Sequence, residues 1–542
     1  MRITQRTGLA VLGAIALLGL AACSGAPAPS LGGSASGSPT SEAPAGGGEW
    51  ILGTTDKITA IDPAGAYDIG SWNLQYSIFE QLVAVPGGES TPVGDAAESC
   101  EYDDAQTITC KLRPDNKFSN GNALTSSDVK FSFERNIAIN DPNGASILLA
   151  NLSDGAEAPK LKAGAIETPD DLTVVFHLNN PDLTFLSVIS GAVASIVDEE
   201  TFPADALLPD DQVVGSGPLQ LDSFTKDQQA ALSANPNYAG KRTPQSDRVF
   251  IQYFADASPL RQAIESKGVD VAWRTLSPTD LTSLRTNSAV SVVDGEGAEF
   301  RYWVAQTKNE ATGKLAVRQA VANLIDRAAI ARDVYDDQVN PAWSIVPPGF
   351  GGHTPSFQTK WGEAPNPDNA KKILDDAGIS IPVDLTIGYT PTRYGPNAVD
   401  EANMIAEQLN NSGLFTVKIE SAEWSEYQSL YKEGAYDLFQ LGWYPDFLDA
   451  DNYLAPFIVD GGFFQNGYSN PEVNELVVKQ QGETDAAARE AILGQLQDIV
   501  ANDVPLIPSW NGKNVAVALP EVKGVAETLD ATYIFRMWSI SK

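Results

Sequence analysis

The sequence predicts an α/β protein whose folded body has two or three lobes. Short segments rich in branched and aromatic residues alternate with longer segments that carry a helical pattern of apolar residues. Behind an N-terminal leader the chain keeps roughly 490 residues, too many for one simple hydrophobic core. No internal repeat of fixed period is visible in the sequence.

Strands are expected where branched and aromatic residues cluster over four to eight positions. The segments are LTVVFHL (172–178), VFIQYF (249–254), VDLTIGY (383–389) and YDLFQLGW (436–443).

Helix starts are marked by residues that satisfy free backbone N–H groups. Thr125 and Asp128 have the spacing of a capping box. Asn366-Pro367 and Asn470-Pro471 each place proline at the first helical position behind a capping asparagine. The apolar periodicity of residues 314–335 and 484–505 predicts one long helix in each segment.

The N-terminus predicts export. Residues 1–22 have a basic start and an uncharged apolar run, as in a secretory signal peptide, and this run is short for a membrane span. Leu20-Ala21-Ala22-Cys23 resembles the lipobox of bacterial lipoproteins, which implies cleavage before Cys23 and a lipid on its sulfur. The protein would then sit on the extracytoplasmic face of the cell membrane. An ordinary cleavage site with an incidental cysteine is the alternative.

The segment that follows the leader is expected to be a flexible tether. Residues 23–48 consist largely of Gly, Ala, Ser and Pro, which bury too little apolar surface to fold. The folded body is expected to begin near Glu49.

The charge balance excludes some partners. The formal net charge is −34, whereas binding to nucleic acid needs a basic surface. The same excess of acids argues against adhesion to anionic lipid and favours simple solubility.

Cys100 and Cys110 are predicted to form a disulfide. They lie in SCEYDDAQTITCKL, where a polar turn separates two short segments of strand character, so that a hairpin would bring the cysteines together. Two free thiols are the alternative.

Motifs for enzymes and cofactors are absent from the sequence. It has two histidines, His177 and His353, far apart, and no nucleophile elbow, P-loop or zinc-ligand spacing. We therefore expect no enzyme activity, no cofactor and no bound metal.

Several blocks in the same order resemble the bacterial solute-binding lipoproteins of family 5, which serve peptide and nickel ABC importers. The blocks are KFSNGNALTSSDVKFSFERN (117–136), VVGSGPLQLDSF with NPNYAG (213–240), AVRQAVANLIDRAAIA (316–331), YDLFQLGWYPDFLDADNY and NDVPLIP. Ser216 stands where the family usually has threonine.

The resemblance implies a fold and partners. The expected fold is a clamp like the type II periplasmic binding proteins, with an extra domain, three lobes and mixed sheets. Lobe I would comprise 49–82, 215–298 and 515–542, lobe II 83–214, and lobe III 299–514. Lobes I and III would close on the ligand as a monomer, and a membrane permease with its ATPase subunits would take the ligand from it.

The resemblance also implies ligand contacts. Asp446, in Gly442-Trp443-Tyr444-Pro445-Asp446, would bind the α-ammonium group of a peptide, with Trp443 and Tyr444 beside it. Arg393, in the imperfectly matching TPTRYGPN, would bind the peptide carboxylate. Trp424, in Glu-Trp-Ser-Glu-Tyr, would form a wall of the pocket. Asp449 and Asp451 are expected to be helix caps or solvated acids.

Four functions remain open from the sequence. A peptide-binding protein of an importer is the leading one. The same fold also serves oligosaccharides or nickel chelates, because fold does not fix the ligand. A surface carboxylate hydrolase would need two acids at a catalytic separation. An adhesion or signalling role is the fourth.

Overall fold

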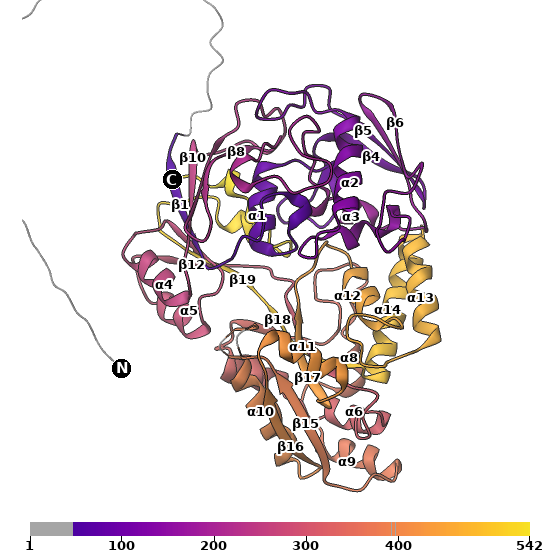
Figure 1. Cartoon of the computed structure of the whole chain (residues 1–542). Helices are drawn as coiled ribbons and strands as arrows, with labels where there is room; N and C mark the ends of the chain where they lie inside the picture. Colours follow the sequence, from indigo (N-terminus) through magenta and orange to yellow (C-terminus); the bar gives the residue numbers. More distant parts are fainter. Residues whose placement is uncertain (1–46, 392, 396) are drawn as a thin grey trace, which may run out of the picture. The chain divides into compact units, whose positions relative to one another are not determined.

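The computed structural model describes residues 47–391, 393–395 and 397–542. The predicted signal peptide, Cys23 and nearly all of the predicted tether lie outside these residues. Residues 46–542 form one compact unit, in which helices and strands alternate as the predicted α/β class requires (Figure 1). Among the described helices, none is long and apolar enough to cross a membrane.

The first sheet has seven strands in the order β12-β19-β11-β1-β10-β9-β8. Its central strands β11, β1 and β10 run parallel, so their carboxyl ends lie at one edge. The strands are β1 (Glu49–Thr54), β8 (Leu219–Thr225), β9 (Gln229–Ala234), β10 (Arg248–Tyr253), β11 (Val271–Trp273), β12 (Ser291–Gly295) and β19 (Asn514–Ala518).

The second sheet has six strands in the order β14-β18-β13-β17-β15-β16. Strands β17, β15 and β16 run parallel, and β13 is antiparallel to both of its neighbours. The strands are β13 (Phe300–Ala305), β14 (Val339–Pro341), β15 (Val383–Tyr389), β16 (Phe415–Ser421), β17 (Leu438–Trp443) and β18 (Leu506–Gly512).

A four-stranded sheet has the order β4-β5-β7-β6, with a small β2-β3 pair beside it. The expected hairpin is present, because β4 pairs antiparallel with β5, and Cys100 lies directly opposite Cys110. The two cysteines form a disulfide with their Cα atoms 4.0 Å apart. The strands are β2 (Val83–Ala84), β3 (Val93–Gly94), β4 (Ala97–Asp104), β5 (Thr107–Leu112), β6 (Ile166–Asp170) and β7 (Thr173–His177).

The helices begin largely where their capping residues predict. Asp128 accepts a hydrogen bond from the Thr125 N–H at the start of α2, and the Asn366 and Asn470 side chains cap α9 and α13. The helices are α1 (Ile69–Ile78), α2 (Ser126–Ile139), α3 (Phe185–Val188), α4 (Ala257–Glu265), α5 (Pro278–Leu284), α6 (Leu315–Ala322), α7 (Arg327–Ala329), α8 (Ser356–Trp361), α9 (Pro367–Asp376), α10 (Ala398–Asn411), α11 (Trp424–Glu433), α12 (Asp451–Ile458), α13 (Pro471–Gly482) and α14 (Ala486–Asp503).

The prediction of one long helix over 314–335 is wrong. Helix α6 ends at Ala322, and a short α7 and a π-helical turn follow it. Asn323 directs its amide to α9, where its Oδ1 accepts a hydrogen bond from Asn369 at 2.8 Å. Asp326 caps the Ala329 N–H at 2.9 Å. Polar side chains that bond locally compete with a continuous helix, and here they interrupt it.

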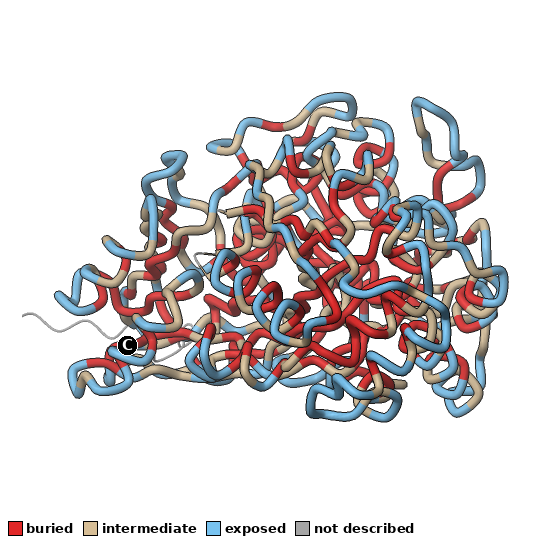
Figure 2. Tube along the Cα trace, turned by 90° about the horizontal axis from the view of Figure 1, so that it is seen from below, coloured by how far each residue is buried: buried red, intermediate tan, exposed pale blue. Residues whose placement is uncertain are grey.

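Buried residues gather in the interior of the molecule, and exposed residues lie at its periphery (Figure 2). Leu52 and Trp273 of the first sheet belong to the same core as Ile108 and Val174 of the four-stranded sheet. The second sheet has a core of its own, built around Tyr302 and its neighbours. The lobe boundaries of the sequence analysis stay a prediction.

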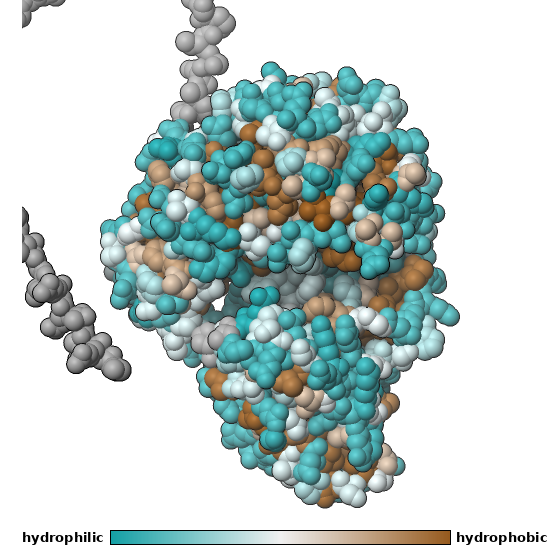
Figure 3. Space-filling view, in the orientation of Figure 1, coloured by the Kyte–Doolittle hydropathy of each residue, from teal (hydrophilic) through white to brown (hydrophobic). Residues whose placement is uncertain are grey.

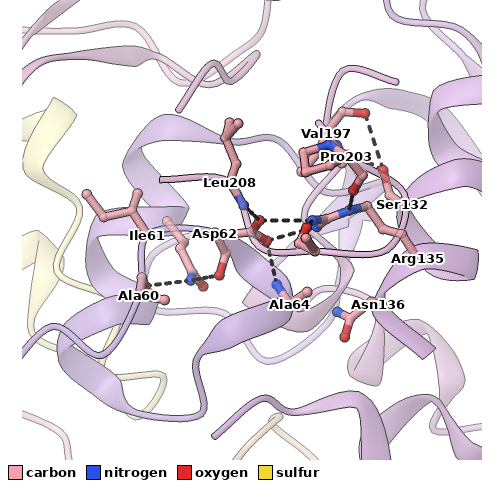
Figure 4. Close-up of polar contacts among 12 residues, drawn as sticks. Ala60, Ile61, Asp62, Ala64, Ser132, Arg135, Asn136, Val197, Pro203 and Leu208 are labelled. Carbon is pink, nitrogen blue, oxygen red and sulfur yellow. Dashed lines mark hydrogen bonds and ion pairs between the residues drawn. The ribbon is translucent and has the colours of Figure 1, made fainter. Parts of the chain in front are cut away.

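A buried ion pair joins the first sheet to α2. The carboxylate of Asp62, in the segment after β1, accepts hydrogen bonds at 2.8 and 2.9 Å from both terminal nitrogens of Arg135 (Figure 4). It also accepts from the Leu208 N–H at 2.8 Å and the Ala64 N–H at 3.0 Å. The pair is fully enclosed and bidentate, which fixes these segments together.

The described chain passes between the first and the second sheet through two short connections. Residues 296–299 lie between β12 and β13, and Lys513 alone lies between β18 and β19.

Candidate ligand-binding site

The residues expected to bind a ligand lie at one edge of the second sheet. Arg393 follows β15, Trp424 follows β16 and Asp446 follows β17, and these strands are parallel neighbours. Ligands of open α/β sheets bind beyond the carboxyl ends of the strands. The topology therefore gathers segments that are far apart in the sequence at the edge where a ligand is expected.

Asp446 is a partly buried carboxylate with neutral hydrogen-bond partners. The Tyr67 hydroxyl donates to it, and Asn452 Nδ2 donates to its Oδ2 at 3.2 Å. Loss of water contact raises the pKa of Asp446 to about 6, although both hydrogen bonds lower it. Within the described residues no lysine or arginine pairs with it, and an anion so placed favours a cationic ligand.

Aromatic rings surround this carboxylate in a narrow cavity. Its walls come from helix α1, from the segment after β17 and from the C-terminal segment. They are Ile69, Trp72, Asn73, Tyr76, Tyr444, Pro445, Asp446, Thr532 and Tyr533. Figure 3 shows this face of the molecule hollowed between the parts that carry α1 and α11. Ring faces attract cations, so the walls and the carboxylate favour the same kind of ligand group.

Trp443 does not line this cavity. Its ring packs edge-on against Phe457 at 5.0 Å, and its Nε1 donates to Asn452 Oδ1 at 3.0 Å. The same oxygen accepts from the Asp446 N–H at 2.8 Å. Trp443 therefore orients Asn452, which in turn orients Asp446.

Two guanidinium groups lie over the ring of Tyr444. The central carbon of Arg274, which follows β11 in the first sheet, is 5.1 Å from the centroid of the Tyr444 ring. The corresponding carbon of Arg301, in β13 of the second sheet, is 5.8 Å from the same centroid. The carboxyl edges of the two sheets thus meet at this ring.

Arg393 and Trp424 lie further along the same edge. The exposed Arg393 guanidinium stacks on the Trp424 ring, with its central carbon 5.1 Å from the centroid. Tyr394 packs against Trp424 at 5.8 Å, and Arg301 lies 4.4 Å over the Tyr394 ring. These ring contacts connect Arg393 to Tyr444, which is two residues from Asp446.

The two acids after Asp446 have structural partners. Asp449 forms a bidentate ion pair with Arg489 at 2.7 and 2.9 Å and accepts from the Asp451 N–H at the start of α12. Asp451 is buried rather than solvated, and Gln480 and Gln481 donate to it. Burial raises the pKa of Asp451 to about 7.

The sequence analysis missed Tyr67, Arg274 and Arg301, and also the cavity walls from α1 and the C-terminal segment. None belongs to a motif, and each reaches the site through tertiary packing. A positional signal existed for Arg274, which directly follows the short apolar segment Val271–Trp273. Among the described residues, no group of three or more His, Cys, Asp or Glu side chains is arranged to hold a metal ion.

Two sheets whose carboxyl edges meet at an aromatic cavity define a clamp-like binding protein. Residues 91–465 match the model of the bacterial extracellular solute-binding proteins, family 5 Middle. The chain belongs to this family of solute-binding proteins.

Known proteins of the same kind differ in what their names say they bind. The dipeptide-binding protein DppE of Bacillus subtilis is 25% identical over 499 residues, which cover 88% of this chain and 90% of that protein. The heme-binding protein A of Haemophilus influenzae is 27% identical over 509 residues, with the same two coverages. The crystal structure of Haemophilus influenzae OppA in complex with RPPGFSPFR matches with a TM-score of 0.73 and 22% identity, over 91% of this chain and 98% of that one. The last comparison shows the fold.

Proposed function

We propose that this protein is the substrate-binding component of an ABC importer, and that it captures peptides by their α-ammonium group. The observation that carries the proposal is the carboxylate of Asp446, partly buried in an aromatic cavity and paired with neutral donors. A ligand ammonium would supply its missing counter-charge.

The contacts around Asp446 suit this task. Asn452 and Tyr67 both donate hydrogen bonds to the carboxylate, so the group is oriented before the ligand arrives. The rings of Trp72, Tyr76 and Tyr444 offer apolar surface that tolerates varied side chains. Peptide binding is also what the names of DppE and of the OppA complex describe for those proteins.

Arg393 and Trp424 are proposed to serve the other end of a longer peptide. Arg393 is exposed and has its guanidinium on the Trp424 ring, which leaves the fork of donors available to a carboxylate. Such a division of labour needs no catalytic group, and the protein is proposed not to be an enzyme.

The calorimetric test compares two proteins and two ligands. Wild-type protein is titrated with Ala-Ala and with N-acetyl-Ala-Ala, which lacks the ammonium. We expect Ala-Ala to bind, and both N-acetylation and Asp446→Asn to weaken binding by about 2–5 kcal/mol. Asp498→Asn, on α14, is the matched control. Equal binding by the wild type and by Asp446→Asn contradicts the proposal.

Native mass spectrometry of the purified protein separates the other ligand classes. A series of peptide masses supports the proposal. A single sugar or a nickel chelate retained by the protein contradicts it and identifies that solute as the ligand.

The membrane attachment is proposed from the sequence alone. A lipid on Cys23 and a tether over 24–48 would keep the body close to a permease. The protein should incorporate labelled palmitate in cells, and Cys23→Ala should abolish the label. A label that survives in this variant refutes the anchor.

A further inference from the structure

The guanidinium groups of Arg274 and Arg301 both lie over the Tyr444 ring and use only part of their donors. Arg301 Nη2 lies 2.5 Å from Glu299 Oε1, and Arg274 Nε lies 3.2 Å from Asp56 Oδ1. Arg301 Nε and Nη1 and Arg274 Nη1 have no hydrogen-bond acceptor within the described part of the chain. Buried guanidinium nitrogens are normally paired, so these call for an acceptor.

Aromatic rings next to Arg301 hold its guanidinium group in a position to bind an acceptor. It is 4% exposed and lies over the rings of Tyr394 and Trp510, at 4.4 and 5.2 Å from their centroids. Rings fix the plane of a guanidinium and leave its edge free for hydrogen bonds. The edge, with its unpaired nitrogens, is the part that recognises a carboxylate.

The backbone at Arg274 is strained. Arg274 and Thr275 are consecutive residues in the left-handed region, with φ of 67° and 63°. Residues other than glycine adopt it rarely, and such strain concentrates at functional sites. It occurs where β11 ends, at the carboxyl edge that faces Tyr444. The strained backbone therefore coincides with the residue that contacts this ring.

We infer that Arg274 and Arg301 form an anion subsite for a carboxylate that the ligand carries close to its ammonium group. This inference rests on the proposed function, and it narrows the ligands to peptides that carry a carboxylate close to the ammonium group. Tyr444 lines the Asp446 cavity and also contacts both arginines, so the sites for the two charges of the ligand adjoin the same ring. Arg393 is separate from this subsite.

The carboxylate has two sources, which three ligands distinguish. Ala-Ala carries a terminal carboxylate, Ala-Glu amide carries one on a side chain, and Ala-Ala amide carries none. For the wild type we expect Ala-Ala or Ala-Glu amide to bind at least about tenfold more tightly than Ala-Ala amide, as for a charge-assisted pair. The tighter of the two identifies the source.

The matched variant removes one arginine together with its acid. Arg274→Gln alone leaves Asp56 unpaired, so the double variant Asp56→Asn/Arg274→Gln is used beside it, and a thermal melt reports folding. The control is Arg285→Gln, whose ion pair with Asp294 lies at the surface. The gain in affinity that the ligand carboxylate provides should be lost in the double variant and should persist in the control.

Each of the following results would overturn the inference. One is a carboxylate gain of equal size in the wild type and the double variant. Another is a loss that is the same for all three ligands, which indicates a structural effect. If the wild type binds none of the peptides, the proposed function fails as well; if it binds Ala-Ala amide as tightly as the other two, only the anion subsite fails.

Discussion

Arg301 occupies the space that a side chain at Gly442 would need. The two residues are directly opposite on β13 and β17, and a Cβ atom at residue 442 would lie 1.6 Å from Arg301 Nη1. Gly442 thus allows a guanidinium to lie flat across the strand that leads to Asp446.

The substitution Gly442→Ala is expected to displace Arg301, which cannot move without leaving the rings of Tyr394 and Trp510. Overpacking of this kind costs about 1–3 kcal/mol of unfolding free energy, measured by urea denaturation. Gly494→Ala, where the nearest neighbour of the new Cβ is 3.5 Å away, is the control and should be neutral or stabilising. Equal stability of the two variants would refute the contact.

Peptide affinity should depend on pH through Asp446, whose pKa is raised to about 6. Below this pH the free protein holds a neutral acid there, so an ammonium gains no counter-charge. The dissociation constant should rise by up to about tenfold for each pH unit below 6. Calorimetry between pH 5 and pH 7.5 checks this, and Asp446→Asn should show no such slope.

The raised pKa of Asp446 also affects the stability of the fold, which should fall as pH rises, whereas peptide affinity should increase. Between the ordinary value of 3.8 and about 6, the folded protein binds a proton that the unfolded chain releases. The contribution of Asp446 to the unfolding free energy therefore falls as pH rises through this window. The difference in stability between wild type and Asp446→Asn, measured at pH 4 and pH 6.5, should change in favour of the variant at pH 6.5.

Tyr67→Phe removes a hydrogen bond that favours the ionised form of Asp446. The pH midpoint of peptide binding should move upward, because the carboxylate then ionises less readily. Calorimetric pH profiles of wild type and variant measure this shift. In the Asp446→Asn background the Tyr67 substitution should have no effect on the profile, and a remaining shift would assign the effect to another group.

Glu401→Gln should destabilise the core of the second sheet. The buried Glu401 carboxylate accepts hydrogen bonds from Trp303, Tyr335, Ser509 and Trp510, at 2.7–3.0 Å. An amide turns one acceptor into a donor that faces two donors, at a cost of about 2–3 kcal/mol. Glu407→Gln, on the exposed side of the same helix, is the control, and urea denaturation of both variants gives the comparison.

Local signals in the sequence were sufficient for much of the secondary structure. Strand β15 has the predicted bounds, and α9 begins at the predicted proline, because alternation and capping act within a few residues. The interruption after Ala322 was not predictable in this way. It depends on Asn323 and Asp326 bonding to partners, one of them on another helix, while the apolar pattern continues.

The residues of the candidate site show the same difference between what a local sequence motif predicts and what depends on tertiary packing. Asp446, Arg393 and Trp424 were expected through a family motif, and their roles as ligand contacts stay predictions. No motif contains Tyr67, Arg274 or Arg301. Their proximity arises from the order of the strands and from a backbone conformation that cannot be predicted from residue type. An arginine is usually a surface residue, and nothing in the sequence marks these two as arginines with buried, unpaired nitrogens.

The two connections between the sheets define an axis about which one sheet can rotate relative to the other. One is a single residue, Lys513, and the other spans 296–299, so neither has slack for the sheets to slide or separate. Rotation about the line through them is the motion that leaves both cores intact. The resistance to that rotation comes from contacts between the edges, such as Tyr67 with Asp446. Glu299 ends one of the connections and pairs with Arg301, so a ligand bound at the proposed anion subsite would act directly on this connection.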